Sequence, residues 1–178
     1  CDDDQHDTTI ENNVIARVCG EGIIFKGQNT IRNNILYDVR DRTPDGTPCV
    51  HKRGYLVLPY GAVDGSIVQR NILVSRIPGQ ALLFERTQPA SRSASHLAPA
   101  MLRTCAADYN MYFNTAEAGW GQKHLEAQRR FGIEQHSLEA DPQFIDPAKD
   151  KFTGGKDSPA RKLGVEPMDI SRVGPRKN

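Results

Sequence analysis

The sequence predicts an all-β fold, a right-handed single-stranded parallel β-helix. A five-residue motif occurs four times, a glycine follows it, and a short β-prone run follows the glycine. The first two copies begin 21 positions apart, which suits one circuit of such a solenoid and is too short for two packed helices with their turns. The copies are Ile10-Glu11-Asn12-Asn13-Val14, Ile31-Arg32-Asn33-Asn34-Ile35, Val68-Gln69-Arg70-Asn71-Ile72 and Ala107-Asp108-Tyr109-Asn110-Met111.

The asparagine in the fourth position of every copy has a physical reason. Its amide can bond to the equivalent amide one coil away, and asparagine tolerates left-handed backbone angles at a turn. We therefore expect a ladder of stacked asparagines along the solenoid. We also expect Ile10 and Ile31 to point inward, together with the aliphatic residue after each ladder asparagine, and Asn12 and Asn33 to face solvent. The ladder consists of Asn13, Asn34, Asn71 and Asn110.

Each coil has a second strand after the repeated motif, at about residues 23–25, 55–58 and 81–84. Two insertions, at about 38–53 and 86–100, carry Pro, Gly and Ser without a strand pattern, so they should project as loops. We expect the coils to occupy 1–121, and a short helix at about 122–131 to open a closing part of the same domain, 122–178. Leu125 and Phe131 are the predicted apolar contacts of this helix. An antiparallel β-sandwich with chance Asn-Asn turns is the alternative fold.

The closing part combines prolines with isolated apolar residues. Pro142, Pro147 and Pro159 prevent regular strand pairing. The apolar residues, which would anchor an irregular cap over the last coil, are Phe144, Ile145, Phe152 and Leu163. The run from His136 to Pro147 and the motifs after it resemble the closing segment of bacterial β-helical carbohydrate-active proteins.

The opening of the chain, Asp2-Asp3-Asp4 followed by Thr9-Ile10-Glu11-Asn12-Asn13, is similar to glycoside hydrolase family 141, whose members include xylanase and α-L-fucosidase activities. The two resemblances together cover most of the chain. They imply a β-helical glycoside hydrolase, or its C-terminal fragment, that acts on a plant or microbial polysaccharide.

Composition limits the partners. The 178 residues carry a net charge of only +1 with scattered Lys and Arg, which argues against nucleic-acid and membrane-surface binding. A neutral or mildly acidic polysaccharide or oligosaccharide is the expected ligand, and we expect a secreted or periplasmic protein whose signal peptide is not in this chain. The four cysteines form no Cys-x-x-Cys pair. Cys19 and Cys49 fall in turns of neighbouring coils, and either a disulfide or free thiols fits them.

Glycoside hydrolysis needs two carboxyl groups, held about 5–5.5 Å apart for retention or about 6.5–9.5 Å apart for inversion. Adjacent coils about 4.8 Å apart can supply such distances. Asp3 is the first candidate, because counting back from the ladder places it beside Ile24 with its side chain outward. Asp2 and Asp4 are candidates for the second carboxylate or for orienting groups, and Glu21 is a partner acid. The alternative is that the aspartates are a solvated, charged end.

The candidate substrate-binding residues are Lys26, His51, Arg53, Tyr60 and Glu85. Lys26 and Glu85 should line one outward face, the cationic cluster ending at Arg53 suits a uronate or a general acid, and Tyr60 could stack on a sugar ring. Trp120 could stack likewise or pack under the closing helix. The sequence assigns no metal ligands.

Two other functions fit the sequence. A polysaccharide lyase would abstract a proton next to a uronate, with Lys26, His51 or Arg53 as base and calcium as cofactor. A non-catalytic carbohydrate-binding solenoid would present an uncapped first coil, which would pair with an upstream fragment or another copy.

Overall fold

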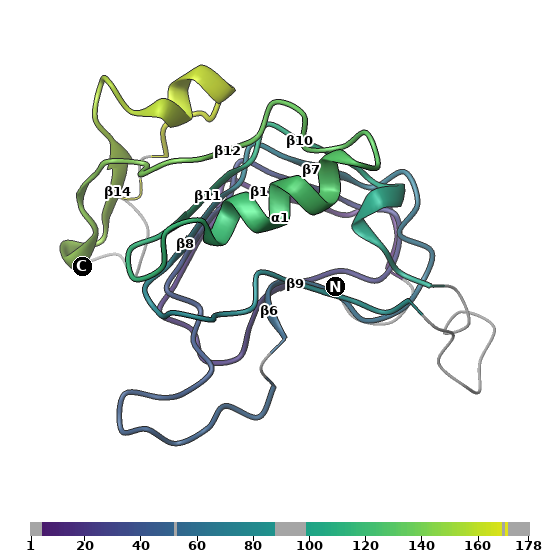
Figure 1. Ribbon diagram of the computed structural model, residues 1–178, viewed down its shortest axis with the longest axis horizontal. Helices are drawn as coiled ribbons and strands as arrows, with labels where there is room; N and C mark the ends of the chain where they lie inside the picture. The colour runs from purple at the N-terminus through teal and green to yellow at the C-terminus, as the bar shows by residue number, and fades with distance from the viewer. Residues whose placement is uncertain (1–4, 52, 88–98, 169, 171–178) are drawn as a thin grey trace, which may run out of the picture.

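The computed structural model describes residues 5–51, 53–87, 99–168 and 170, and its strands lie mainly in three parallel sheets (Figure 1). The first sheet contains β1 (Thr9–Glu11), β4 (Thr30–Arg32), β7 (Ile67–Gln69) and β10 (Ala106–Asp108). The second contains β2 (Val14–Ala16), β5 (Ile35–Tyr37), β8 (Ile72–Ser75), β11 (Met111–Asn114) and β12 (Leu138–Glu139). The third contains β3 (Glu21–Ile24), β6 (Gly54–Leu58) and β9 (Leu83–Glu85).

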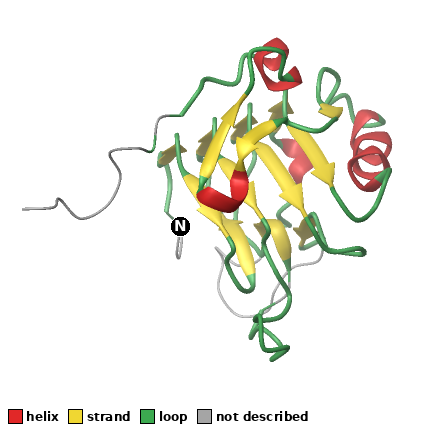
Figure 2. Cartoon of the chain, turned by 90° about the vertical axis from the view of Figure 1, so that its left-hand side faces the viewer, coloured by secondary structure: helices red, strands yellow, loops and turns green. Residues whose placement is uncertain are grey.

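The chain visits the three sheets in the same order on successive passes, and every pairing within these sheets is parallel. Figure 2 shows the strands running side by side from a second direction. The expectation of a largely β chain with parallel strands is confirmed, and the antiparallel sandwich is wrong. The remaining elements are the antiparallel pair β13 (Phe144–Asp146) and β14 (Lys151–Gly154), the helix α1 (Trp120–Arg129), and the 3-10 turns η2 (Leu102–Thr104), η3 (Pro147–Lys149) and η4 (Pro159–Leu163).

The predicted asparagine ladder is confirmed. Asn13 Nδ2 donates to Asn34 Oδ1 at 3.0 Å, Asn34 Nδ2 to Asn71 Oδ1 at 3.0 Å, and Asn71 Nδ2 to Asn110 Oδ1 at 3.1 Å. Each of these oxygens also accepts the backbone N–H of the asparagine one coil earlier. The ladder therefore satisfies buried polar groups at the corner between the first and second sheets.

Two other side chains end the ladder. Ser137 Oγ accepts the backbone N–H of Asn110 at 2.8 Å, and Glu134 Oε1 accepts its Nδ2 at 3.1 Å. Tyr112 donates its hydroxyl to the same Glu134 oxygen at 2.8 Å. Glu134 is buried, which raises the pKa of its carboxyl above the ordinary value.

The residue after each ladder asparagine was expected to point inward, and this is wrong. The ladder asparagine itself occupies the inner corner, so strand alternation turns the next residue outward and the one after it inward. The residues on the outer face are Val14, Ile35, Ile72 and Met111, whereas the enclosed core receives Ile15, Leu36, Leu73 and Tyr112. Ile31 points inward as expected, and Ile10 packs at the rim of that core.

The closing segment, residues 142–168, does not seal the last coil as expected. Phe152, Ala160 and Leu163 pack on the outer apolar face of the second sheet, where the ring centroids of Tyr37 and Phe152 lie 5.2 Å apart. Figure 1 shows β14 and the chain after it beside the second sheet, away from the coil end that α1 covers. The segment also covers Asn33, expected to face solvent, whose amide pairs with the backbone of Glu166. The outer face is apolar, and this explains why the segment binds there.

In the first three coils a strand of the third sheet follows the strand of the second sheet, whereas in the last coil helix α1 follows β11 instead. The helix therefore covers the core at the last coil. Trp120 and Leu125 are buried, and the ring of Trp120 packs edge-on against Tyr55 at 5.5 Å. Phe131, the second predicted contact, is 52% exposed and lies beyond the helix end, so that prediction is wrong. In the described part of the chain, no helix has the length and apolar character that crossing a membrane requires.

Candidate functional site

The structure gathers five of the candidate residues around one groove of about 420 Å³ on the outer side of the third sheet. They come from successive passes of the chain, because β3 and β6 are parallel neighbours whose flanking residues meet at the same edges. The lining residues are Glu21, Ile24, Lys26, His51, Arg53, Pro59 and Tyr60.

Glu21 and Arg53 form an ion pair at one end of this groove. The register pairs Glu21 with Gly54, so Arg53 enters β6 directly beside the carboxylate. The Glu21 side chain is only 7% exposed and the Arg53 side chain 28%. Arg53 also lies over the ring of Phe84 at 5.3 Å, which orients its guanidinium. Glu21 is the one carboxylate among the described lining residues, and Arg53 neutralises its charge.

Lys26 and Tyr60 form the other end. The Lys26 ammonium lies 4.6 Å from the centroid of the Tyr60 ring, and the lysine is only 8% exposed. The chain after Tyr60 approaches Lys26 so closely that a Cβ at Gly61 would lie 1.7 Å from the Lys26 carbonyl oxygen. Because Gly61 also has a φ of +97°, only glycine fits this contact. Gly61 therefore positions the aromatic ring over the cation.

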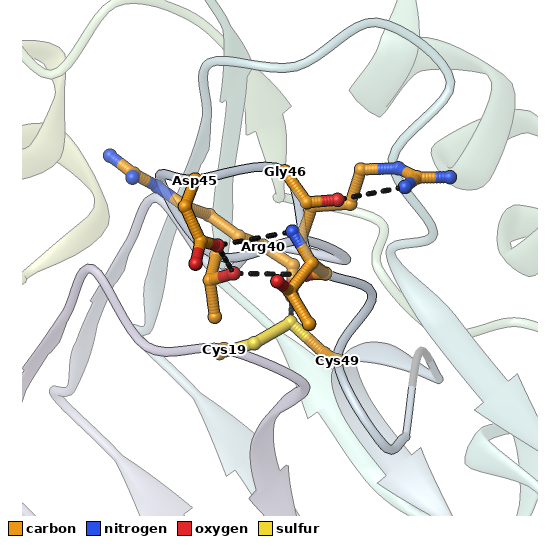
Figure 3. Close-up of a disulfide and its surroundings, with 8 residues drawn as sticks. Cys19, Arg40, Asp45, Gly46 and Cys49 are labelled. Carbon is orange, nitrogen blue, oxygen red and sulfur yellow. Dashed lines mark hydrogen bonds between the residues drawn. A yellow bond between two sulfur atoms is a disulfide. The ribbon is translucent and has the colours of Figure 1, made fainter.

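His51 reaches the groove from the first insertion, which a disulfide between Cys19 and Cys49 fastens to the turn before β3 (Figure 3). The two Cα atoms lie 5.6 Å apart. The sequence left the state of these cysteines open, and the structure assigns them a disulfide. Cys105 is a free buried thiol, and burial raises its pKa to about 12. Cys1 lies outside the described residues.

Glu85 is not in the groove, so the expectation that it shares a face with Lys26 is wrong. Glu85 pairs with Leu58, whose side chain is completely buried, and strand alternation points both side chains to the core side. The Glu85 carboxylate accepts the backbone N–H of Leu102. Trp120, the first residue of α1, is buried against the core and cannot stack on a sugar. The predicted catalytic residues Asp2, Asp3 and Asp4 lie outside the described residues.

A second polar cluster, on the outer side of the first sheet, was not predicted. His136 Nδ1 lies 2.7 Å from Asp108 Oδ2, and the His136 ring stacks on Tyr109 at 4.8 Å. Burial has the largest single influence on Asp108 and raises its pKa, but hydrogen bonds from His136 and Tyr109 outweigh it, so the pKa is lowered overall. The only signal in the sequence was that Asp108 and Tyr109 directly precede a ladder asparagine.

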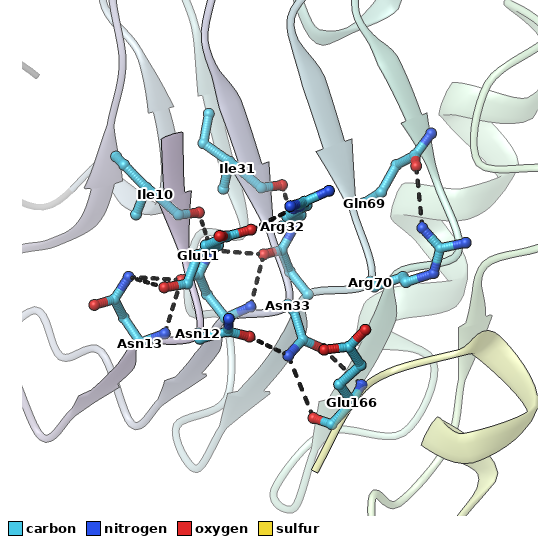
Figure 4. A network of polar contacts seen from close by, with 12 residues as sticks. Ile10, Glu11, Asn12, Asn13, Ile31, Arg32, Asn33, Gln69, Arg70 and Glu166 are labelled. Carbon is cyan, nitrogen blue, oxygen red and sulfur yellow. Dashed lines mark hydrogen bonds and ion pairs between the residues drawn. The ribbon is translucent and has the colours of Figure 1, made fainter. Parts of the chain in front are cut away.

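Beside this cluster lies a groove of about 270 Å³ (Figure 4). Glu11 forms an ion pair with Arg32 across two coils. The amide of Asn33 donates to Asn12 Oδ1 and to the Glu166 carbonyl, so it ties the closing segment to the coils. These polar groups already bond to one another, which is typical of a structural network. The lining residues are Glu11, Asn12, Arg32, Asn33, Arg70 and Glu166.

Among the described residues, no group of three or more His, Cys, Asp or Glu side chains is arranged to hold a metal ion. Comparisons of the chain with family models, with curated proteins and with solved structures find no match to any of them. The functional argument therefore rests on the geometry of the third-sheet groove.

Proposed function

We propose that the chain is a right-handed parallel β-helix, secreted or periplasmic, whose third-sheet groove binds an acidic polysaccharide and cleaves it by β-elimination next to a uronate. The observation that carries this proposal is the charge of the groove. Two cations, Lys26 and Arg53, stand against a single described carboxylate, Glu21, which is already ion-paired, and His51 adds an imidazole beside them. Such a site attracts a carboxylated sugar.

The solenoid part of the proposal rests on topology. The chain passes through the three sheets in the same order, and the coils stack in register along the asparagine ladder. Crossovers between parallel strands are right-handed in nearly all proteins, which favours the right-handed form. Among the described strands, β1, β2 and β3 each end a sheet, which supports pairing of the first coil with an upstream segment or another copy. The Cys19–Cys49 disulfide supports an oxidising compartment.

Binding would use three kinds of contact. Arg53 and Lys26 would donate charge-assisted hydrogen bonds to a uronate carboxylate. Tyr60 and Pro59 would contact the apolar face of a sugar ring. Glu21 would keep the Arg53 guanidinium oriented, so that its remaining N–H groups point into the groove. The groove lies open on the surface of the sheet, which suits a polymer rather than a small enclosed ligand.

The reaction would need a base and a positive field. The His51 imidazole would take the proton from the carbon next to the uronate carboxylate, the electron pair would form the double bond, and the glycosidic oxygen would leave and take a proton from water. Lys26 and Arg53 would stabilise the negative charge that develops on the carboxylate. In this scheme the two cations supply the charge that calcium supplies in metal-dependent elimination.

Glycoside hydrolysis is the second candidate, and Glu21 favours it because a carboxylate lines the groove. Hydrolysis needs a second carboxyl group within about 5–9.5 Å. The remaining candidates for that group are Asp2, Asp3 and Asp4. Hydrolysis would act on neutral glycans as well, whereas the elimination requires a uronate.

The test is incubation with polygalacturonate and with neutral xylan. The proposal predicts ultraviolet absorbance from an unsaturated product with polygalacturonate alone, and a loss of about 100-fold or more in kcat for His51→Asn. Glu117→Gln, at an exposed ion pair with Lys123 outside the groove, should leave turnover unchanged. Reducing-sugar release without the absorbance would favour the hydrolase, and binding without turnover would favour the non-catalytic solenoid. Absence of both binding and turnover would contradict all three.

A further inference from the structure

We propose that the Cys19–Cys49 disulfide is the positioning element of the third-sheet groove: it holds His51 and Arg53 against Glu21, so that the affinity for an acidic saccharide depends on the oxidised bond. This inference rests on the proposed function and adds to it a dependence on the redox state. It concerns a bond outside the groove that acts through the residues lining it.

The disulfide joins the two segments that supply one end of the groove. Cys19 lies two positions before Glu21, and Cys49 lies two positions before His51 and four before Arg53. The bond and the Glu21–Arg53 ion pair therefore fasten the same two segments at neighbouring points. Gly20, next to Cys19, lies close to the backbone of His51: a Cβ placed on Gly20 would be 3.1 Å from the His51 carbonyl oxygen.

The rest of the insertion is held separately from the groove residues. Its tip is a small hairpin closed by pairing of Arg42 with Pro48 and by hydrogen bonds around Asp45 (Figure 3). Its first half joins the body through the Arg40 backbone, which donates to the Val18 carbonyl at 2.8 Å and accepts from Gly20 N–H at 2.7 Å. Opening the disulfide would leave these bonds in place.

The second half is attached at Cys49, whose N–H donates to the Asp41 carbonyl at 2.9 Å, and again at Gly54, which pairs with Glu21. Val50 is 92% exposed, and among the described residues neither Val50 nor His51 makes a hydrogen bond or an ion pair. After Cys49 the next attachment is the Arg53–Glu21 ion pair, and part-exposed pairs of this kind hold a chain only weakly without further support. The disulfide therefore adds a covalent restraint two residues before His51, on the side of the segment away from β6.

Reduction of this bond is chemically accessible. Cys19 is exposed, so a dithiol can attack the disulfide; the S–S bond breaks, both cysteines become thiols, and the reductant closes to its own disulfide with transfer of two electrons and two protons. The free thiol of Cys105 is buried, and its raised pKa disfavours the reactive thiolate. Among the described cysteines, dithiothreitol thus acts on one bond.

The experiment measures the Kd for trigalacturonate by titration calorimetry, at a temperature well below unfolding. Six forms are compared: the oxidised chain, the chain reduced with dithiothreitol, the double variant Cys19→Ser with Cys49→Ser, and each of these three with Arg53→Gln. We expect reduction or the double variant to weaken binding about tenfold, as Arg53→Gln does in the oxidised chain. Combining them should add little, because Arg53 is already displaced.

A purely structural disulfide would behave differently. It would lower Tm while leaving the Kd of the folded chain unchanged, or its effect and that of Arg53→Gln would multiply independently. Either result would overturn the inference, and the reduced wild-type chain gives the answer even if the serine variant does not fold. Absence of binding by the oxidised chain would instead refute the proposed function.

Discussion

At the scale of single residues, the ladder shows why asparagine recurs and no other side chain does. Asn71 Oδ1 accepts both the backbone N–H and the Nδ2 of Asn34. Its Nδ2 donates to Asn110 Oδ1 and to the Ile31 carbonyl, so every polar atom of the buried amide is paired. Aspartate would lack the two donors, and the single hydroxyl of serine has one proton to donate, so it could not make both bonds that the Asn71 Nδ2 makes.

Asn71→Ala should therefore lower the free energy of unfolding by about 3 kcal/mol or more, because it leaves several buried groups without partners. Asn13→Ala, at the exposed end of the same ladder, should cost about 1 kcal/mol or less. Urea unfolding followed by circular dichroism measures both. Equal losses at the two positions would show that burial along the ladder does not set its strength.

At the scale of elements, the second sheet is buried on both faces. Leu36 and Leu73 face the enclosed core, while Ile35 and Ile72 face outward beneath the closing segment. A sheet of this kind has nearly continuous apolar strands, and its outer face needs a cover. Phe152 supplies much of that cover, so the closing segment is part of the core and not only an end piece.

Phe152→Ala should cost about 3–5 kcal/mol, the range for removing a buried phenylalanine. The closing segment should also become sensitive to limited proteolysis before the coils do, because its other attachments are fewer. Ile145→Ala is the control: Ile145 lies on β13 in the same segment but is 65% exposed, and its loss should change stability by less than about 0.5 kcal/mol. Similar effects of both substitutions would contradict the packing described here.

At the scale of the whole molecule, two buried titratable groups at the end covered by α1 have opposite effects on stability. Burial lowers the pKa of His124 from 6.5 to about 4, so its contribution is present above pH 6.5 and is lost as pH falls toward 4. Burial raises the pKa of Glu134 above its usual 4.5, so its contribution is present below pH 4.5 and is lost as pH rises through the raised pKa.

Single substitutions should separate these two slopes. In Glu134→Gln the histidine remains, so Tm should rise between pH 4.5 and 6.5. In His124→Gln the glutamate remains, so Tm should fall as pH rises over the same interval. The Tm of the wild-type chain should vary less over this interval than the Tm of either variant, because the two contributions oppose each other. Thermal unfolding at a series of pH values measures this, and slopes of the same sign in both variants would refute the assignment.

Much of the candidate groove could be predicted from residue type and repeat position alone. Lys26, His51, Arg53 and Tyr60 flank second strands of the coils, and parallel pairing brings such flanking residues together. Glu85 could not be placed in the same way. Its inward direction depends on the register that pairs Glu85 with Leu58, and the interval of 27 positions between them differs from the 21-position repeat of the first two coils.

The sequence by itself determined the repeat, the ladder asparagines, the parallel strands and the loop that carries His51, because each depends on a local pattern repeated at one spacing. Only the tertiary structure decided which apolar face of the second sheet is enclosed, where the closing segment binds and that Cys19 pairs with Cys49. The physical reason is that a strand apolar on both faces has no period to show its inner side. Packing partners distant in sequence make that choice.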